Sequence, residues 1–340
     1  MNQSNRIEYL DYSRAFACIL VVIGHLLMSF QDAGFIDNIF ASFFRKTIYH
    51  FHVYVFIFCS GYLFQKSFTK YTDKRTYFKE KIIRCLDFAV TYVIFTFITY
   101  FIKTILSGNV NSEVEGSFLY ILCHKPINQM WYLYAILFIT FFAPLIRSKN
   151  NVYILLIIAL CEKTLFCILS KRGVSIPLPV NYLLQHQTWF LLGMIWEYKN
   201  IKLSSAKAFL LGGLFLFLSV IAFITDSRNH LLSFLLNFSG IVGTVEIIRC
   251  LTKKASSMSV GWRYLSKYMY QIYLMHTIFA AGIRIILLKL SISNLGIHIL
   301  FGLIFSFVVP VICAMVAEKI TLLNIVFFPS KTIAKLKKNN

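Results

Sequence analysis

Residues 15–28 read AFACILVVIGHLLM, an apolar run in which His25 is the only strongly polar side chain. Comparable runs are FAVTYVIFTFITYFI at 88–102 and LLGGLFLFLSVIAFI at 210–224. A helix needs roughly 20 mostly apolar residues to cross the hydrocarbon core of a bilayer. These stretches therefore predict membrane-spanning helices.

The composition of the whole chain supports the same interpretation. Of the 340 residues, 58% are hydrophobic and only 14% are charged, whereas soluble domains carry about 25% charged residues. So few charges could not cover a water-exposed surface, although a lipid-facing surface needs none. We therefore expect an all-α, polytopic protein of the cell (plasma or inner) membrane, with the lipid bilayer as its first partner.

The apolar runs divide the chain into ten expected spans, joined by short polar segments. The segment before the fourth span contains a short apolar piece at 118–123 that cannot cross a membrane and could be re-entrant or interfacial. The expected spans are at about residues 12–31, 47–65, 84–106, 130–147, 152–170, 182–198, 207–226, 230–250, 267–290 and 296–325.

The net charge of +20 comes from short basic clusters between the apolar runs. Cytoplasmic loops have this pattern under the positive-inside rule, and no nucleic-acid recognition motif is present. With the N-terminus inside, 22 Lys and Arg (including Arg6) fall in inner segments and at most eight (including Arg228) in outer ones. We therefore place both termini in the cytoplasm and expect no nucleic-acid partner. The expected organisation is one transmembrane domain at 1–330 followed by a short basic tail at 331–340.

The first expected span carries an unusual set of ionisable residues, Asp11, Arg14 and His25. Arg14 and His25 are eleven residues apart, which is about 20° past three full helical turns, so both lie on one face of the helix, about 16 Å apart along its axis. Asp11 lies one turn from Arg14 and can pair with it. Such groups are costly in lipid and usually face a protein interior. The alternative is that Arg14 reaches the headgroups and His25 bonds a neighbouring helix.

Five segments of the chain resemble the motifs of the membrane-bound acyltransferase-3 family, and they occur in the same order as in that family. The resemblance extends from residue 6 to about residue 325. Four positions depart from the usual family pattern: Tyr54 stands where Pro is common, Lys81 where Arg is common, and Met269 and Gln271 where Ser is common. The segments are RAFACILVVIGH at 14–25 (preceded by YLD at 9–11), FHVYVFIFCSGYL at 51–63, KIIR at 81–84, WYL at 131–133 and IYLMH at 272–276.

The resemblance implies transfer of an acyl group, with acetyl favoured, from cytoplasmic acyl-CoA to a hydroxyl of a cell-surface or exported polysaccharide. On this interpretation His25 handles the proton or the acyl group as a neutral imidazole, and Arg14 orients the donor or balances developing charge. Basic residues at the inner end of the third span would attract the phosphates of the coenzyme. The residues expected at the coenzyme are Lys81, Arg84 and Arg75, and those expected at the acceptor are His52, His276 and Trp131.

Simpler roles compete with several of these assignments. The basic residues could be topology signals alone, His276 could make a structural hydrogen bond, and Ser60-Gly61 could permit close helix packing. The eight cysteines lie mostly inside apolar runs and form no CxxC pair, so we expect buried thiols and no metal site.

The alternative function is a transporter or flippase for an envelope precursor, which would predict internal repeats or broken helices. A catalytically idle sensor is a third possibility, against which the presence of both Arg14 and His25 argues. The sequence does not specify the acceptor sugar, the acylated position, the acyl length or the oligomeric state.

Overall fold

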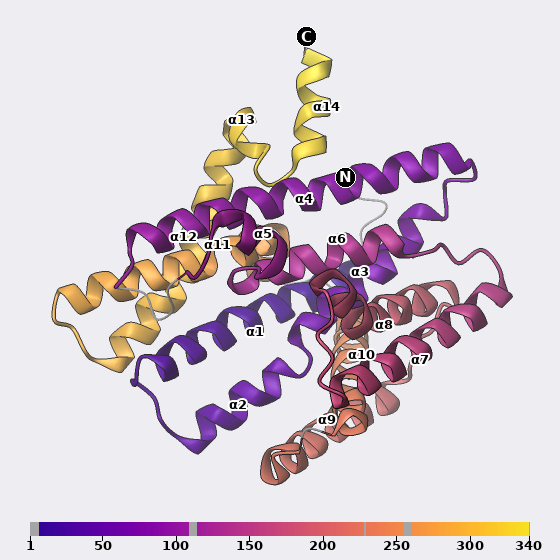
Figure 1. Ribbon diagram of the computed structural model, residues 1–340, viewed down its shortest axis with the longest axis horizontal. Helices are drawn as coiled ribbons and strands as arrows, with labels where there is room; N and C mark the ends of the chain where they lie inside the picture. Colours follow the sequence, from indigo (N-terminus) through magenta and orange to yellow (C-terminus); the bar gives the residue numbers. More distant parts are fainter. Residues whose placement is uncertain (1–6, 109–113, 228, 255–259, 340) are drawn as a thin grey trace. The chain divides into compact units, whose positions relative to one another are not determined.

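The computed structural model describes residues 7–108, 114–227, 229–254 and 260–339 (Figure 1). The predicted all-α class is confirmed, since 83% of the structure is helical and the described residues contain no strand. Arg6 and Arg228, which entered the charge count, lie outside the described residues.

The helices follow one another with short connections. In chain order they are α1 (Glu8–Asp32), α2 (Ile39–Tyr49), α3 (His52–Phe68), α4 (Lys74–Ile105), α5 (Phe118–His124), the 3₁₀ turn η2 (Asn128–Met130), α6 (Trp131–Phe142), α7 (Lys149–Lys171), α8 (Leu178–Tyr198), α9 (Ser205–Thr225), α10 (His230–Lys254), α11 (Val260–Lys289), α12 (Leu295–Lys319), α13 (Thr321–Asn324) and α14 (Pro329–Asn339).

Eight segments of the described chain are long and apolar enough to cross a membrane: α1, the α2–α3 pair, α4, α7, α9, α10, α11 and α12. The helix expected at 130–147 is shorter than predicted, because Pro144 disfavours helical geometry at Ala143 and α6 ends at Phe142. Its 12 residues extend about 18 Å, less than the ~30 Å hydrocarbon core. The span expected at 182–198 is α8, which has 21 residues but is not among the eight. The count of ten spans and the cytoplasmic location of both termini stay predictions.

The chain divides into two compact units, each assembled from three separate segments. Unit 1 comprises Met1–Val21, Asn38–Asp73 and Phe142–Lys267, and unit 2 comprises Val22–Asp37, Lys74–Phe141 and Tyr268–Asn340. The continuous helix α1 thus contributes its first half to unit 1 and its second half to unit 2.

In unit 1, α3 and α8 pack at van der Waals distance through two glycines. A Cβ atom at Gly61 would overlap the carbonyl of Phe190 on α8, and one at Gly193 would overlap the carbonyl of Phe58 on α3. Small residues at helix interfaces allow this close approach in membranes. The packing interpretation of Ser60-Gly61 therefore holds for Gly61.

Gln65, near the end of α3, is fully buried and bonds both polar groups of one backbone position. Its amide nitrogen donates to the carbonyl of Ile146 (2.7 Å), and its amide oxygen accepts from the N–H of Ile146 (3.1 Å). Ile146 lies in the irregular segment that follows α6, where no helical bond is available. One side chain thereby satisfies a buried stretch of irregular backbone, as burial requires.

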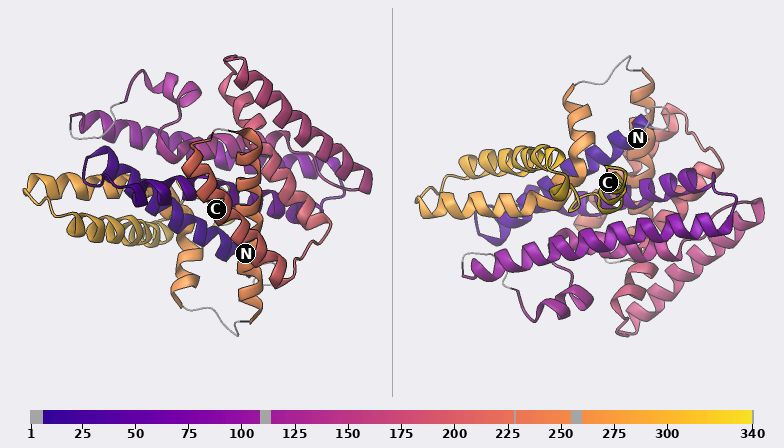
Figure 2. Two further views of the ribbon diagram at one scale, coloured as in Figure 1. Left: turned by 90° about the horizontal axis from the view of Figure 1, so that it is seen from below. Right: turned by 90° about the horizontal axis from the view of Figure 1, so that it is seen from above.

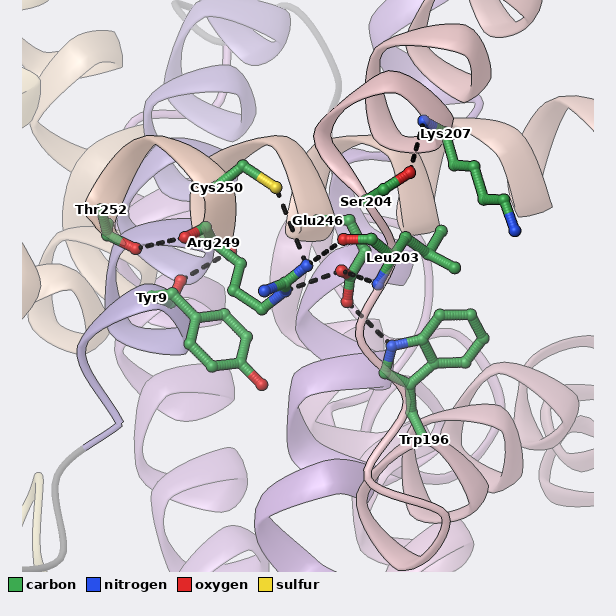
Figure 3. A network of polar contacts seen from close by, with 10 residues as sticks. Tyr9, Trp196, Leu203, Ser204, Lys207, Glu246, Arg249, Cys250 and Thr252 are labelled. Carbon is green, nitrogen blue, oxygen red and sulfur yellow. Dashed lines mark hydrogen bonds and ion pairs between the residues drawn. The ribbon is translucent and has the colours of Figure 1, made fainter. Parts of the chain in front are cut away.

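A buried ion pair holds α8, α10 and their neighbouring loop together in unit 1 (Figure 3). The carboxylate of Glu246 accepts from the guanidinium of Arg249 (2.7 Å), the indole N–H of Trp196 (2.9 Å) and the backbone N–H of Leu203 (2.9 Å). Arg249 also donates to the carbonyl of Leu203. A buried ion pair is tolerated when further hydrogen bonds satisfy it in this way, so this network is structural.

In unit 2, α12 returns antiparallel beside α11 after a short loop (Figure 2). The first turn of the C-terminal helix α14 is bonded to α4. The carboxylate of Asp87 on α4 accepts from the backbone N–H (2.8 Å) and the hydroxyl (2.6 Å) of Ser330 on α14. A carboxylate at a helix N-terminus is favourable. The basic residues expected as a tail at 331–340 therefore begin within a helix anchored on α4.

The α3–α8 contact generates a stability prediction. Gly61→Ala is expected to destabilise the protein, since an added methyl in a crowded site costs roughly 1–3 kcal/mol. Gly213→Ala on α9 is the matched control: nothing lies within 4 Å of a Cβ there, and Ala at an open helical position is favoured over Gly by about 0.4–1 kcal/mol. The measurement is the temperature at which half of the detergent-solubilised protein stays monodisperse. Equal losses in both variants would contradict the contact.

Candidate active site

The cavity that contains His25 lies entirely within unit 2 and has a volume of about 140 Å³. Its walls come from the second half of α1, the last turns of α4, the η2 turn and the middle and later turns of α11. Most of the lining is apolar. The polar and charged lining residues are His25, Ser29, Asp32, Thr99, Lys103, Asn128, His276, Thr277 and Arg284.

The structure brings His25 and His276 together in this cavity. The centroids of their rings are 5.3 Å apart, with an angle of 51° between the ring planes. They come from α1 and α11, more than 250 residues apart in sequence. Two neighbouring imidazoles suit proton transfer, since each neutral ring has one nitrogen that accepts and one that donates.

The hydrogen bonds of His276 define which of its nitrogens can accept a proton. Nδ1 lies 3.1 Å from the carbonyl oxygen of Ile272 and 2.9 Å from that of Tyr273. A carbonyl oxygen only accepts, so Nδ1 carries the hydrogen and Nε2 keeps its lone pair in the neutral ring. The side chain is 1% exposed, and Nε2 has no hydrogen-bond partner. Nε2 is therefore a buried, unoccupied acceptor beside His25.

The η2 turn that closes one wall of the cavity is held against α11 by Gln129, which is 2% exposed. Its amide nitrogen donates to the carbonyl of Leu274 (3.0 Å), and its amide oxygen accepts from the hydroxyl of Thr277 (3.0 Å). The hydroxyl of Tyr273 donates to the backbone carbonyl of Gln129. These three bonds fix the segment of α11 that carries His276, so Gln129 is a positioning residue for the cavity.

Arg14 lies in the first half of α1, within unit 1. Its guanidinium is 3.7 Å from the carboxylate of Asp11, so the predicted pairing is confirmed. Because α1 is one continuous helix from Glu8 to Asp32, Arg14 and His25 share a helix face as their spacing predicts. The role of Arg14 at the donor stays a prediction.

The three residues expected at the coenzyme lie on α4 in unit 2. Lys81 is buried, and its ammonium lies over the ring of Tyr77 at 5.7 Å. Arg84 is half-buried and Arg75 is exposed. Lys81 and Arg84 are one turn apart on the same side of the helix, whereas none of the three lines the cavity of His25.

The other two residues expected at the acceptor lie elsewhere. His52 begins α3 in unit 1, where its Nδ1 is 2.6 Å from the carbonyl oxygen of Ile48 and its ring packs against Tyr49. Trp131 begins α6 in unit 2, directly after the η2 turn. Neither residue lines the cavity, so of the three only His276 does.

Outside the spans, an exposed ion pair lies in the segment between α4 and η2. The ammonium of Lys125 is 2.8 Å from the carboxylate of Glu115. This hydrogen bond lowers the pKa of Glu115 and raises the pKa of Lys125. Exposed pairs of this kind contribute little to stability.

Two residues at the cavity, Gln129 and Arg284, were not predicted from the sequence. Arg284 gave a signal, because a charged residue inside an apolar run of α11 is rare. Gln129 gave none, since a polar residue beside a short loop is ordinary. No group of three or more His, Cys, Asp or Glu that could hold a metal ion occurs within the described ranges.

Residues 7–315 match the acyltransferase-3 family model, described as an acyltransferase domain. No curated protein and no solved structure matched the chain. The match covers nearly the whole chain, so the protein is a membrane acyltransferase. It belongs to the acyltransferase-3 family.

The role of Gln129 is testable by a double-mutant cycle with Thr277. Gln129→Leu is expected to lower the free energy of unfolding by about 1–3 kcal/mol, because buried partners lose their hydrogen bonds. Combined with Thr277→Val, the loss is expected to be smaller than the sum of the single losses by at least about 0.5 kcal/mol. The measurement is denaturant-induced unfolding in detergent micelles. If the losses in the free energy of unfolding were strictly additive, the proposed interaction between Gln129 and Thr277 would be contradicted.

Proposed function

We propose that this protein is an O-acyltransferase that moves an acyl group from cytoplasmic acyl-CoA to a hydroxyl of a cell-surface or exported polysaccharide. The acyltransferase-3 match supports the acyl transfer. The observation that carries the assignment of the site is the pair of imidazoles, His25 and His276, in one cavity, with Nε2 of His276 lacking a partner.

The imidazoles of His25 and His276 can have different roles toward one bound sugar. His25 takes the proton of the attacking hydroxyl as its oxygen forms the new bond to the carbonyl carbon and the carbon–sulfur bond of the thioester breaks. The proton then passes to the leaving thiolate, so the imidazole returns to its neutral form. His276 accepts a hydrogen bond from a neighbouring hydroxyl at Nε2 and orients the sugar.

The family resemblance leaves a second route open for His25. In this route an imidazole nitrogen bonds to the acyl carbon as the carbon–sulfur bond breaks and the thiolate leaves. The sugar hydroxyl oxygen then bonds to the acyl carbon as the carbon–nitrogen bond breaks, and the hydroxyl proton passes to the thiolate, so the imidazole returns to its neutral form. Both routes need His25 to be neutral and both need the sugar in the same cavity.

The family resemblance favours acetyl, the acyl group of acetyl-CoA, as the group that is transferred. Neither of the two routes through His25 uses a metal ion.

The acyl-CoA donor would approach from the first turns of α4, whereas the last turns of α4 line the cavity. Under the predicted orientation, Lys81 and Arg84 lie near the cytoplasmic end of α4, and Lys103 lies at its outer end. Lys81 and Arg84 are the residues proposed to bind the phosphates of the coenzyme, with Arg75 in an outer electrostatic role. Arg14 is proposed to act on the donor from the first half of α1.

His25→Ala is expected to abolish acetylation of the host glycan while the protein still inserts into the membrane, since the proton acceptor is lost. The measurement is the acetyl ester signal in the proton spectrum of the purified glycan, beside the amount of protein in the membrane fraction. His230→Ala is the control, because His230 begins α10 in unit 1 and does not line the cavity. An acetyl ester signal that survives in the His25 variant would refute its assignment.

Replacing both Lys81 and Arg84 by Gln is expected to raise KM for acetyl-CoA by at least about tenfold, since two charge-assisted hydrogen bonds to phosphate are removed. The control is Lys79→Gln, which removes one charge at an exposed site of the same helix and tests the general electrostatic attraction. The measurement is steady-state transfer kinetics in proteoliposomes. An unchanged KM in the double variant would remove the donor-site proposal.

A further inference from the structure

Arg284 is a buried cation in the wall of the cavity that the proposed chemistry does not use. Its side chain is 5% exposed and lies on α11, five residues before the helix ends at Lys289. One terminal nitrogen donates to the hydroxyl of Ser29 on α1 and lies 3.4 Å from the Ser29 carbonyl. Its Nε has no hydrogen-bond partner.

The charge of Arg284 is not neutralised by an ion pair within the described residues. Asp32 lines the same cavity and interacts with Arg284 electrostatically, without forming a salt bridge. Lys103, at the end of α4, adds a second positive charge to the lining. With the imidazoles neutral, the lining carries two positive charges and one negative charge.

A buried guanidinium in a membrane protein is costly and is usually paired or functional. Its planar fork is suited to carboxylate and phosphate oxygens, and such bonds are among the strongest in proteins. Because Nε is unsatisfied and the neighbouring charge is only partly balanced, the missing partner that fits this site is an anionic oxygen group.

The site is close enough to the imidazoles for one substrate to reach both. Ser29, which holds Arg284, is one turn from His25 on α1, a rise of about 6 Å. Arg284 is eight residues from His276 on α11, about 12 Å along the axis. A carboxylate or phosphate on the acylated sugar, or on the sugar next to it, would bridge these distances.

We infer that Arg284, supported by Ser29 and Lys103, binds an anionic group of the acceptor, so that the preferred acceptor is an acidic glycan. This inference rests on the proposed function for the identity of the ligand as the acceptor. Under the predicted orientation, the cavity lies near the outer ends of α1, α4 and α11, where such an acceptor would enter.

The experiment uses the full chain in phosphatidylcholine nanodiscs, with binding measured by calorimetry in the absence of acyl donor. The probes are a glucuronate-containing disaccharide, the same disaccharide with its carboxyl reduced to hydroxymethyl, and glycerol phosphate. The anionic probes are expected to bind the wild type at least about tenfold more tightly than the reduced disaccharide. Arg284→Gln is expected to remove this preference, whereas Lys289→Gln, an exposed change on the same helix, is expected to retain it.

Transfer from acetyl-CoA to the two disaccharides is then compared, which separates this inference from the proposed function. Charge-selective binding that depends on Arg284 supports the anion site even if no acetyl is transferred, in which case the proposed function alone fails. Equal binding of charged and reduced probes, or an equal loss of transfer to both in Arg284→Gln, would overturn the inference. Loss of the preference in phosphatidylglycerol nanodiscs would also overturn it, because the anion would then be a lipid headgroup.

Discussion

The hydrocarbon core of a membrane offers no hydrogen-bond partners, and this constraint governs every polar group in the spans. Several buried groups are satisfied inside the protein. Gln65 bonds irregular backbone in unit 1, Glu246 collects three donors, and Gln129 fixes α11 in unit 2. Against this background, a buried polar atom that lacks a partner and lines a cavity is informative. Nε2 of His276 and Nε of Arg284 are both such atoms.

Within unit 2, the hydrogen-bonded side chain of Gln129 holds in position the ring of His276, whose Nε2 has no partner. The bonds of Gln129 to Leu274 and Thr277 hold the turn of α11 that carries His276. The backbone carbonyls of that turn in turn fix the tautomer of His276. A fixed ring with one free acceptor is preorganised for a hydroxyl group, so little reorganisation is needed when a sugar binds. Rigid satisfied bonds are therefore the reason that an unsatisfied atom can be held in a productive position.

The sequence predicted the helical membrane fold and the pairing of Asp11 with Arg14, because apolar runs and local helical spacing are written in short stretches of chain. The roles of His25 and His276 stay predictions. The sequence did not predict the short α6, where Pro144 outweighs an apolar run. It also could not bring His25 beside His276, since that juxtaposition depends on the packing of α1 against distant segments of unit 2. His52 shows the converse limit: its motif resembles that of the family, yet the residue lies outside the cavity.

The most direct test of the central claim is a structure of the protein in nanodiscs with a hydrolysis-resistant acetyl-CoA analogue and an acceptor disaccharide. We expect density for the acyl carbonyl in the cavity of unit 2, with a sugar hydroxyl about 2.6–3.2 Å from an imidazole nitrogen of His25 and a second hydroxyl near Nε2 of His276. Density for both ligands at another site, with this cavity empty, would contradict it.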